Sequence, residues 1–98
     1  YPNSPYSSDA HKRMVYIRDL AAQHELNVAK FYFKRQAYVA AANRASAVVQ
    51  HYQGSSQVRP ALTLMIEAYE KMGKPELAEQ ARQVLRYNES KKQQGPTT

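Results

Sequence analysis

Histidine and carboxylate side chains could support acid-base or metal chemistry, but their spacing in this chain predicts neither. His11, His24 and His51 have no spacing that suggests a metal site or a shared catalytic cluster. The chain has no Cys, which excludes thiol nucleophiles and disulfides. Glu67 and Glu70 share a predicted helix and are typical of solvated carboxylates. We therefore expect no enzyme, no metal site and no cofactor.

Basic side chains indicate binding chemistry instead. From Leu26 to Ile66 the sequence has no Asp or Glu, yet this stretch contains Lys30, Lys34, Arg35, Arg44 and Arg59. A cationic surface steers an acidic protein towards it, and the guanidinium of Arg44 or Arg35 could bind a carboxylate through two parallel hydrogen bonds. The alternative interpretation is an ordinary solvated basic face.

Nucleic acid is a second candidate partner, because the sequence pI is about 9.7. Lysine and arginine could pair with phosphates while Tyr32 and Tyr38 stack on bases. However, the tyrosines occupy positions where side chains normally pack between helices, and no recognised nucleic-acid-binding motif is present. We therefore favour a protein partner and expect no nucleic acid.

The elements that must position these residues are helices. Apolar residues recur at helical spacing, and no Pro or Gly interrupts the chain between Tyr6 and Gln53. Ser8 or Asp9 is placed to cap the first helix near Ala10. The pattern predicts helices over residues 8–35, 37–52, 57–72 and 75–88.

The ends of the later helices carry their own signals. The run from Gln53 to Ser56 predicts a turn, Pro60 fits the first turn of the third helix, and Gly73 should end that helix. On the second helix, Ala41, Ala45 and Val48 share one face, where their small size would let a neighbouring helix approach closely. We expect Tyr16 in the core, and Tyr87 partly exposed. Consecutive aromatics from Phe31 to Phe33 cannot all face inward, and we expect Phe33 or Tyr38 to border an interface. The alternative is that a neighbouring helix of the same chain covers them.

Equivalent residues recur at an interval of thirty-seven, as shown by Tyr32 with Tyr69 and by Ala41 with Ala78. Such a period is typical of stacked helical hairpins that present a binding surface. We expect an all-α domain at residues 1–88, built as a fragment of an α-solenoid with an extended first helix. Residues 89–98 should form a disordered tail, because they contain no apolar side chain. No apolar run approaches the length of a membrane span, and no signal peptide opens the chain, so we expect it to be soluble.

The hairpins resemble tetratricopeptide repeats. Ala29, Tyr32, Tyr38, Ala41 and Val48 match one repeat, and Tyr69, Gly73, Ala78 and Leu85 match the next. Gln36 stands where tetratricopeptide repeats usually have Gly. The resemblance implies paired antiparallel helices, with a generic peptide-binding adaptor as one alternative function.

Nearly the whole chain also resembles the carboxy-terminal half of the BamD family, the tetratricopeptide lipoproteins of the outer-membrane β-barrel assembly machinery. The resemblance rests on Tyr1-Pro2-Asn3-Ser4, Asp9-Ala10, Lys12-Arg13, Val28-Ala29, Tyr32, Asn43-Arg44, Ala68-Tyr69 and Ala78-Glu79, in the same order and spacing. It implies a non-enzymatic scaffold at the periplasmic face of the outer membrane. Membrane attachment would occur only through a lipid anchor that this chain lacks.

The same resemblance implies a partner and a site. In that family the carboxy-terminal repeats contact BamA through the periplasmic POTRA domain nearest the barrel, and the arginine matching Arg44 contributes to this contact. We therefore predict that Arg44, Arg35, Asn43 and Tyr38 bind the POTRA domain of BamA. Other lipoproteins of the machinery are expected as further partners.

Overall fold

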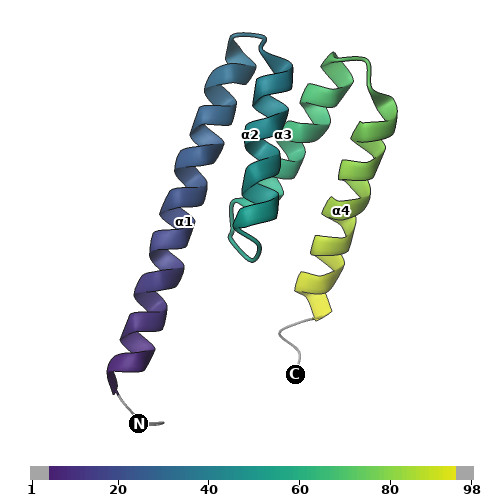
Figure 1. The fold of residues 1–98 in the computed structure, drawn as a ribbon. Helices are drawn as coiled ribbons and strands as arrows, with labels where there is room; N and C mark the ends of the chain where they lie inside the picture. Colours follow the sequence, from purple (N-terminus) through teal and green to yellow (C-terminus); the bar gives the residue numbers. More distant parts are fainter. Residues whose placement is uncertain (1–4, 95–98) are drawn as a thin grey trace.

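Four helices follow one another in antiparallel order in the computed structural model, which describes the backbone of residues 5–94 and the side chains of residues 13–89 (Figure 1). They are α1 (Pro5–Lys34), α2 (Tyr38–His51), α3 (Val58–Lys71) and α4 (Pro75–Gln94). Each helix packs on the next in the chain, and α1 also touches α3. The described residues contain no strand. This arrangement of two successive helical hairpins confirms the predicted all-α, tetratricopeptide-like fold.

Helix α1 begins earlier than predicted. It starts at Pro5, so Ser8 and Asp9 lie inside the helix, and the prediction that one of them caps it near Ala10 is wrong. Proline is well accommodated in the first turn of a helix, because the amide hydrogen it lacks would have no partner within the helix. A proline at the start of α1 was therefore a better boundary signal than the polar residues after it.

The turn between α1 and α2 closes with a Schellman motif centred on Gln36. The Ala37 N–H donates to the Tyr32 carbonyl at 2.9 Å, and the Gln36 N–H donates to the Phe33 carbonyl at 3.0 Å. This geometry requires a positive φ, which is 65° at Gln36. Gln36 therefore occupies a left-handed conformation that glycine adopts at lower cost.

The turn between α3 and α4 repeats the same motif with a glycine. The Lys74 N–H donates to the Tyr69 carbonyl at 2.8 Å, and the Gly73 N–H donates to the Glu70 carbonyl at 3.1 Å. Gly73 has a φ of 71°. The predicted end of the third helix at Gly73 is confirmed, as is the position of Pro60 in the first turn of α3.

The loop between α2 and α3 is held by the middle of α1. The carboxylate of Asp19 accepts hydrogen bonds from the Ser55 hydroxyl, from the Ser56 hydroxyl at 2.9 Å and from the Ser56 N–H at 3.2 Å. One helical position earlier, Arg18 Nη2 donates to the His51 carbonyl at the end of α2, at 3.1 Å. These contacts join the first hairpin to the start of the second.

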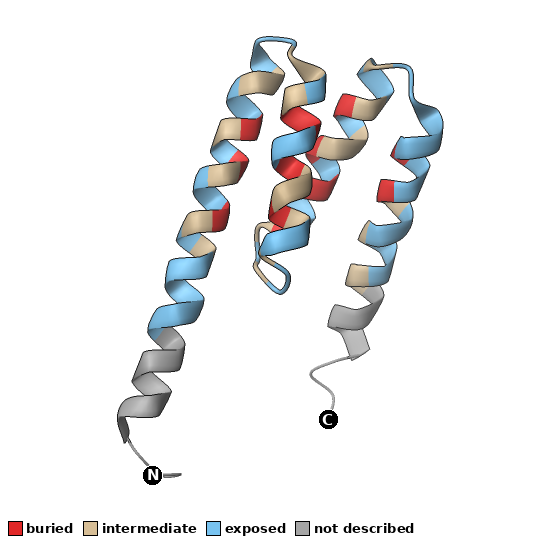
Figure 2. Cartoon of the chain, viewed as in Figure 1, coloured by how far each residue is buried: buried red, intermediate tan, exposed pale blue. Residues whose placement is uncertain are grey.

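Alanines dominate the core, which lies where the four helices overlap (Figure 2). Ala41, Ala45 and Val48 on α2 are fully buried, as predicted for the face that a neighbouring helix approaches. Leu26 and Leu62 are the other large side chains with almost no exposed surface. The fully buried alanines elsewhere are Ala22, Ala29, Ala61, Ala68 and Ala78. Small side chains at these positions allow the helix axes to lie close together.

The amino-terminal half of α1 extends beyond the other helices (Figure 2). Its apolar side chains are exposed: Met14, Val15, Tyr16, Ile17 and Leu20. The prediction that Tyr16 lies in the core is wrong, because its side chain is 64% exposed. The reason is the length of α2, which ends at His51 opposite Arg18 and leaves no described residue to cover the preceding turns of α1.

Helix α4 continues to Gln94, so the prediction that residues 89–94 belong to a disordered tail is wrong. Residues 95–98 of that predicted tail lie outside the described residues. Glu, Lys and Gln, which dominate residues 89–94, favour helix even without apolar neighbours. Glu89 also accepts a hydrogen bond from Arg59 Nη2 of α3 at 2.8 Å, which ties this part of α4 to the bundle. Tyr87, on the preceding turn, is 66% exposed.

Candidate functional site

Arg44 lies on α2 at the border of the face buried against α1. Its Nη1 donates to Glu25 Oε1 at 3.2 Å, across the groove between the two helices. Half of the Arg44 side-chain surface remains exposed, compared with 28% for Glu25. An exposed ion pair of this kind contributes only about 0.2–1 kcal/mol to stability, so Arg44 could exchange it for an incoming carboxylate at small cost.

Arg35 follows the last residue of α1 and lies at the turn to α2. Its guanidinium carbon lies 4.6 Å from the centroid of the Phe31 ring, a cation–π contact within α1 and its C-terminal turn. Phe31 is nevertheless 52% exposed. It is the most exposed aromatic of the run from Phe31 to Phe33, because Tyr32 and Phe33 pack against the buried core.

Tyr38 begins α2 and packs on α1. Its ring meets the ring of Phe33 edge to face, with centroids 5.2 Å apart and an angle of 72° between the planes. Both side chains are half-buried, whereas Asn43 is exposed on α2 beside Arg44. Tyr38 is therefore held by its own helices and has limited surface left for a partner.

The four predicted site residues do not form one cluster. Arg35 and Tyr38 lie at the α1–α2 turn, and Asn43 and Arg44 lie further along α2. Tyr38 and Arg44 are separated by a rise of about 9 Å and a rotation of about 120° on an ideal helix. A protein that contacts all four must follow the edge of the first hairpin rather than enter a pocket.

Folding partly neutralises the basic stretch that the sequence shows between Leu26 and Ile66. Arg44 pairs with Glu25, and Arg59 pairs with Glu89 at 2.8 Å. Both carboxylates lie outside the stretch, so a count along the sequence could not reveal them. The surface of this stretch is therefore less cationic in the folded protein than its sequence alone indicates.

Two hollows were not predicted from the sequence. The larger has a volume of about 900 Å³ and lies where the α2–α3 loop and the start of α3 face the second half of α4. Val58, Arg59, Val84 and Tyr87 are among its lining residues. The smaller, about 380 Å³, lies between α1 and α3, and residues of opposite charge, Lys30 and Glu67, both line it. The apolar residues that meet in the larger hollow belong to three segments, which no single stretch of sequence indicates.

Two carboxyl groups have pKa values below their ordinary range. Hydrogen bonds from Ser55 and then Ser56 lower the pKa of Asp19. Hydrogen bonds from Arg86 and then Arg82 lower the pKa of Glu79. Arg82 also pairs with Glu70 of α3, so this network joins the helices of the second hairpin. Both shifts are explained by contacts that support the fold.

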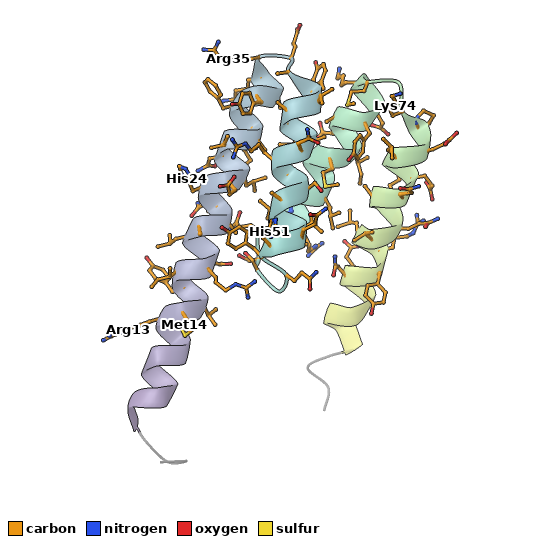
Figure 3. All side chains as sticks on the ribbon, viewed as in Figure 1. Arg13, Met14, His24, Arg35, His51 and Lys74 are labelled. Carbon is orange, nitrogen blue, oxygen red and sulfur yellow. The ribbon has the colours of Figure 1, made fainter. Side chains whose placement is uncertain are left out.

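The histidines are not brought together as a metal site. His24 and His51 are exposed on α1 and α2, and Figure 3 shows them on different helices. The side chain of His11 lies outside the described residues. Among the residues whose positions are described, no three His, Asp or Glu side chains are placed to hold a metal ion. No helix in the same part of the chain is both long enough and apolar enough to cross a membrane.

Comparison with known proteins identifies relatives over nearly the whole chain. It is 48% identical over 91 residues to the outer membrane protein assembly factor BamD of Haemophilus influenzae, covering 93% of this chain and 35% of the relative. It is 46% identical over 88 residues to BamD of Neisseria meningitidis, covering 90% of this chain and 33% of the relative. It is 35% identical over 88 residues to BamD of Vibrio cholerae, covering 90% of this chain and 36% of the relative. The chain thus spans about a third of the length of these relatives.

These relatives are named as assembly factors rather than as enzymes, which agrees with the prediction of a non-enzymatic protein. A family model described as an outer membrane lipoprotein matches residues 1–85, which include all four predicted site residues. The match covers most of α1 to α4 and agrees with their arrangement in helical hairpins. The chain therefore belongs to the YfiO family of outer membrane lipoproteins.

Proposed function

We propose that this chain is a non-enzymatic scaffold of the outer-membrane β-barrel assembly machinery and docks the periplasmic POTRA region of BamA. Its relatives are named as outer membrane protein assembly factors, which supports a role in assembly. The surface proposed for docking is the edge of the α1–α2 hairpin that carries Arg44, with Asn43 beside it and Arg35 and Tyr38 at the turn. Other lipoproteins of the machinery would bind elsewhere on the helical hairpins.

The accessibility of Arg44 supports this proposal most strongly. Half of its side-chain surface is exposed, and Glu25 Oε1 accepts a hydrogen bond from Nη1 alone. A guanidinium has five N–H donors in a fixed planar arrangement, so it can bind a second carboxylate while keeping or releasing the first. Glu25 would hold the arginine in place before the partner arrives, and would limit the rotamer entropy lost on binding.

The partner implied by this chemistry has an acidic side chain at the centre of its contact. Asn43, which is exposed, could donate to or accept from the backbone of the partner. Tyr38 would contribute a ring edge already fixed by Phe33. The scaffold would act by position, because the helical hairpins fix the angle at which the bound POTRA domain meets the rest of the assembly.

Reversal of the charge at Arg44 tests the proposal. We expect Arg44→Glu to reduce co-purification with BamA by about ten-fold or more, because a rim charge pair is replaced by repulsion. Helicity measured by circular dichroism should be unchanged, since the pair with Glu25 is exposed and contributes little to folding.

Two control variants show whether a loss of BamA binding comes from Arg44 itself. One removes its ion pair with Glu25, and the other reverses the charge of a different arginine. Glu25→Gln removes the same ion pair but leaves the guanidinium, so BamA binding should fall much less than in Arg44→Glu. Arg59→Glu reverses another arginine of the basic stretch, which pairs with Glu89, and should leave BamA binding unchanged. Equal loss in Arg44→Glu and Glu25→Gln would show that the ion pair supports the fold and would remove Arg44 from the proposed site.

A further inference from the structure

Cationic side chains gather at one end of the molecule. The α1–α2 and α3–α4 turns lie at the same end, whereas the α2–α3 loop lies at the other (Figure 1). The first turn carries Lys34 and Arg35, and the second carries Lys71 and Lys74, all of them exposed. Figure 3 shows Arg35 and Lys74 on these two turns, far from Arg13 on the opposite end. We call the end formed by these four residues the cationic end.

Helix chemistry accounts for only part of this pattern. Lys34 and Lys71 lie in the last turns of α1 and α3, where a cation interacts favourably with the negative end of the helix dipole. Lys74 is different, because it immediately precedes Pro75 at the amino-terminal end of α4, and its carbonyl accepts the first hydrogen bond of that helix, from the Ala78 N–H at 3.1 Å. A cation there is disfavoured by the dipole, and Ser, Thr, Asp or Asn is the usual choice. Its presence therefore points to a role outside the helix.

Exposed apolar side chains accompany the cations on both turns. Phe31 and Val39 flank the first turn and are 52% and 59% exposed, and Leu77 follows the second turn and is 38% exposed. A surface that alternates lysine with aromatic and aliphatic side chains is typical of protein segments that lie against a lipid headgroup layer. The apolar groups enter the boundary of the acyl chains, and the ammonium groups stay among the phosphates.

Acidic residues do not cancel the charge of this end. Glu70 is the nearest carboxylate on α3, and it pairs with Arg82. Glu76 lies in the first turn of α4, where the helix dipole favours an anion. Against these two, the cationic end has four basic residues. One turn further from the end, Lys30 on α1 is matched by Glu67 on α3, and both line the smaller hollow. The opposite loop contrasts with it, because residues 53–56 carry no charge.

We propose that the cationic end binds anionic phospholipid headgroups at a membrane surface. Three of its four cations are lysines, which act as hydrated point charges on flexible stems and need no fixed partner geometry, whereas bidentate recognition of a fixed carboxylate or phosphate favours arginine. Membership in an outer membrane lipoprotein family supplies a bilayer as the nearby anionic surface. This contact would be additional to the lipid anchor that the family resemblance implies. It shares Arg35 with the proposed POTRA contact, but its three lysines lie outside that contact, which centres on Arg44.

Sedimentation with vesicles tests the electrostatic part. We expect the chain to bind vesicles of phosphatidylglycerol and phosphatidylcholine, and to bind vesicles of phosphatidylcholine alone much more weakly. Each lysine near an anionic surface contributes roughly a five-fold factor, so replacing Lys34, Lys71 and Lys74 by Gln should weaken binding on the order of 100-fold at low salt. Replacing Arg13, Arg59 and Arg86 by Gln lowers the net charge of +6 by the same three charges, but at exposed positions away from the cationic end, and should have a much smaller effect.

Introduced tryptophans test the orientation. The chain has no Trp, so a single one reports its own surroundings without background. We expect the emission of Val39→Trp to shift to shorter wavelength on anionic vesicles, whereas Met14→Trp, which replaces a similarly exposed side chain, should not shift.

Three results would overturn the proposal. They are equal binding of anionic and neutral vesicles, equal effects of the two triple substitutions, and a shift for Met14→Trp but not for Val39→Trp. Loss of BamA binding in the lysine variant, without any affinity of the unaltered chain for anionic vesicles, would instead assign this end to a protein partner. Because Arg44 is intact in every variant, the proposed POTRA contact can fail or hold independently.

Discussion

Gln36 adopts a backbone conformation that glycine would adopt with less strain. Its φ of 65° matches that of Gly73 in the equivalent turn, where the φ is 71°. A non-glycine residue in this region costs roughly 1–2 kcal/mol, part of which is offset because glycine has more freedom in the unfolded chain. We expect Gln36→Gly to raise the free energy of unfolding by about 1 kcal/mol, seen as a higher midpoint in thermal denaturation.

The reverse substitution provides the matched test. Gly73→Ala should lower the free energy of unfolding by about 1 kcal/mol, because a Cβ is introduced at the same backbone conformation. No atom lies close to the position of that Cβ, so the loss would come from the backbone and not from a clash. A lower unfolding midpoint for Gln36→Gly would contradict this account of the turn.

Asp19 links stability to pH through the α2–α3 loop. Its pKa is lowered by hydrogen bonds from Ser55 and Ser56, so the folded state favours the ionised carboxylate. The resulting stabilisation is present above the ordinary aspartate pKa of about 3.9 and is lost as pH falls through the lowered value. We expect the double variant Ser55→Ala with Ser56→Ala to be less stable than the unaltered chain at neutral pH.

The difference in the free energy of unfolding between the unaltered chain and this double variant should become smaller in acid. Urea denaturation at a series of pH values measures it directly. A difference that stays constant from neutral pH to below the lowered pKa would show that the serines stabilise the loop by another route, and not through the charge of Asp19.

Individual site residues were only partly predictable from the sequence. The exposure of Arg44 agrees with its predicted availability to a partner, but its pair with Glu25 depends on how α1 and α2 are set side by side. Likewise, the sequence predicts that Phe33 or Tyr38 borders an interface but not that these two rings pack on each other, nor that Phe31 is the more exposed ring. Helical periodicity gives the direction of a side chain, but the neighbouring helix decides whether that direction is covered.

At the scale of elements, the close approach of α2 to its neighbours depends on alanine. Ala45 is fully buried in the core, on the helix that packs against both α1 and α3. We expect Ala45→Leu to lower the free energy of unfolding by about 1–3 kcal/mol, because the added carbons must push helices apart or adopt strained rotamers. Chemical denaturation followed by circular dichroism would measure the loss.

Gln50→Leu is a suitable control, since Gln50 is exposed on the same helix. It adds similar apolar surface without entering the core, and should change stability by less than about 0.5 kcal/mol. If Ala45→Leu proved equally harmless, the helices would have to be packed more loosely than the buried surface indicates.

Helix boundaries were predicted where a residue has a strong backbone preference. Pro60 and Gly73 marked the first turn of α3 and its end correctly, because each restricts or permits specific φ values. The start of α1 and the end of α4 were not found. Ser8 and Asp9 can cap a helix but can also lie within one, and the stabilising partner of Glu89 is thirty residues away at Arg59.

At the scale of the whole molecule, the four helices form an elongated body with extents of 53, 28 and 14 Å. Such a thin body has large side faces and a modest core, which suits a scaffold that holds partners at separate places. The proposed POTRA contact lies along the first hairpin, and the cationic end lies at the two turns. The exposure of Tyr16 is also a property of the whole fold, because α1 is longer than α2, which packs beside it.

The charge of the whole chain should influence how its partners associate. With a formal net charge of +6, it would be steered towards acidic surfaces, and the association rate should fall as salt is added. Steering alone would be reduced similarly by any charge reversal, whereas a specific contact would depend on one position. The two can therefore be separated by comparing arginines that differ in place but not in charge.

The most direct measurement is a calorimetric titration of the isolated POTRA domain nearest the barrel into three proteins: the unaltered chain, Arg44→Glu and Arg59→Glu. The account predicts binding to the unaltered chain and to Arg59→Glu with similar affinity, and a dissociation constant at least about ten-fold higher for Arg44→Glu. Equal affinity of Arg44→Glu and the unaltered chain, or equal weakening by both reversals, would contradict it.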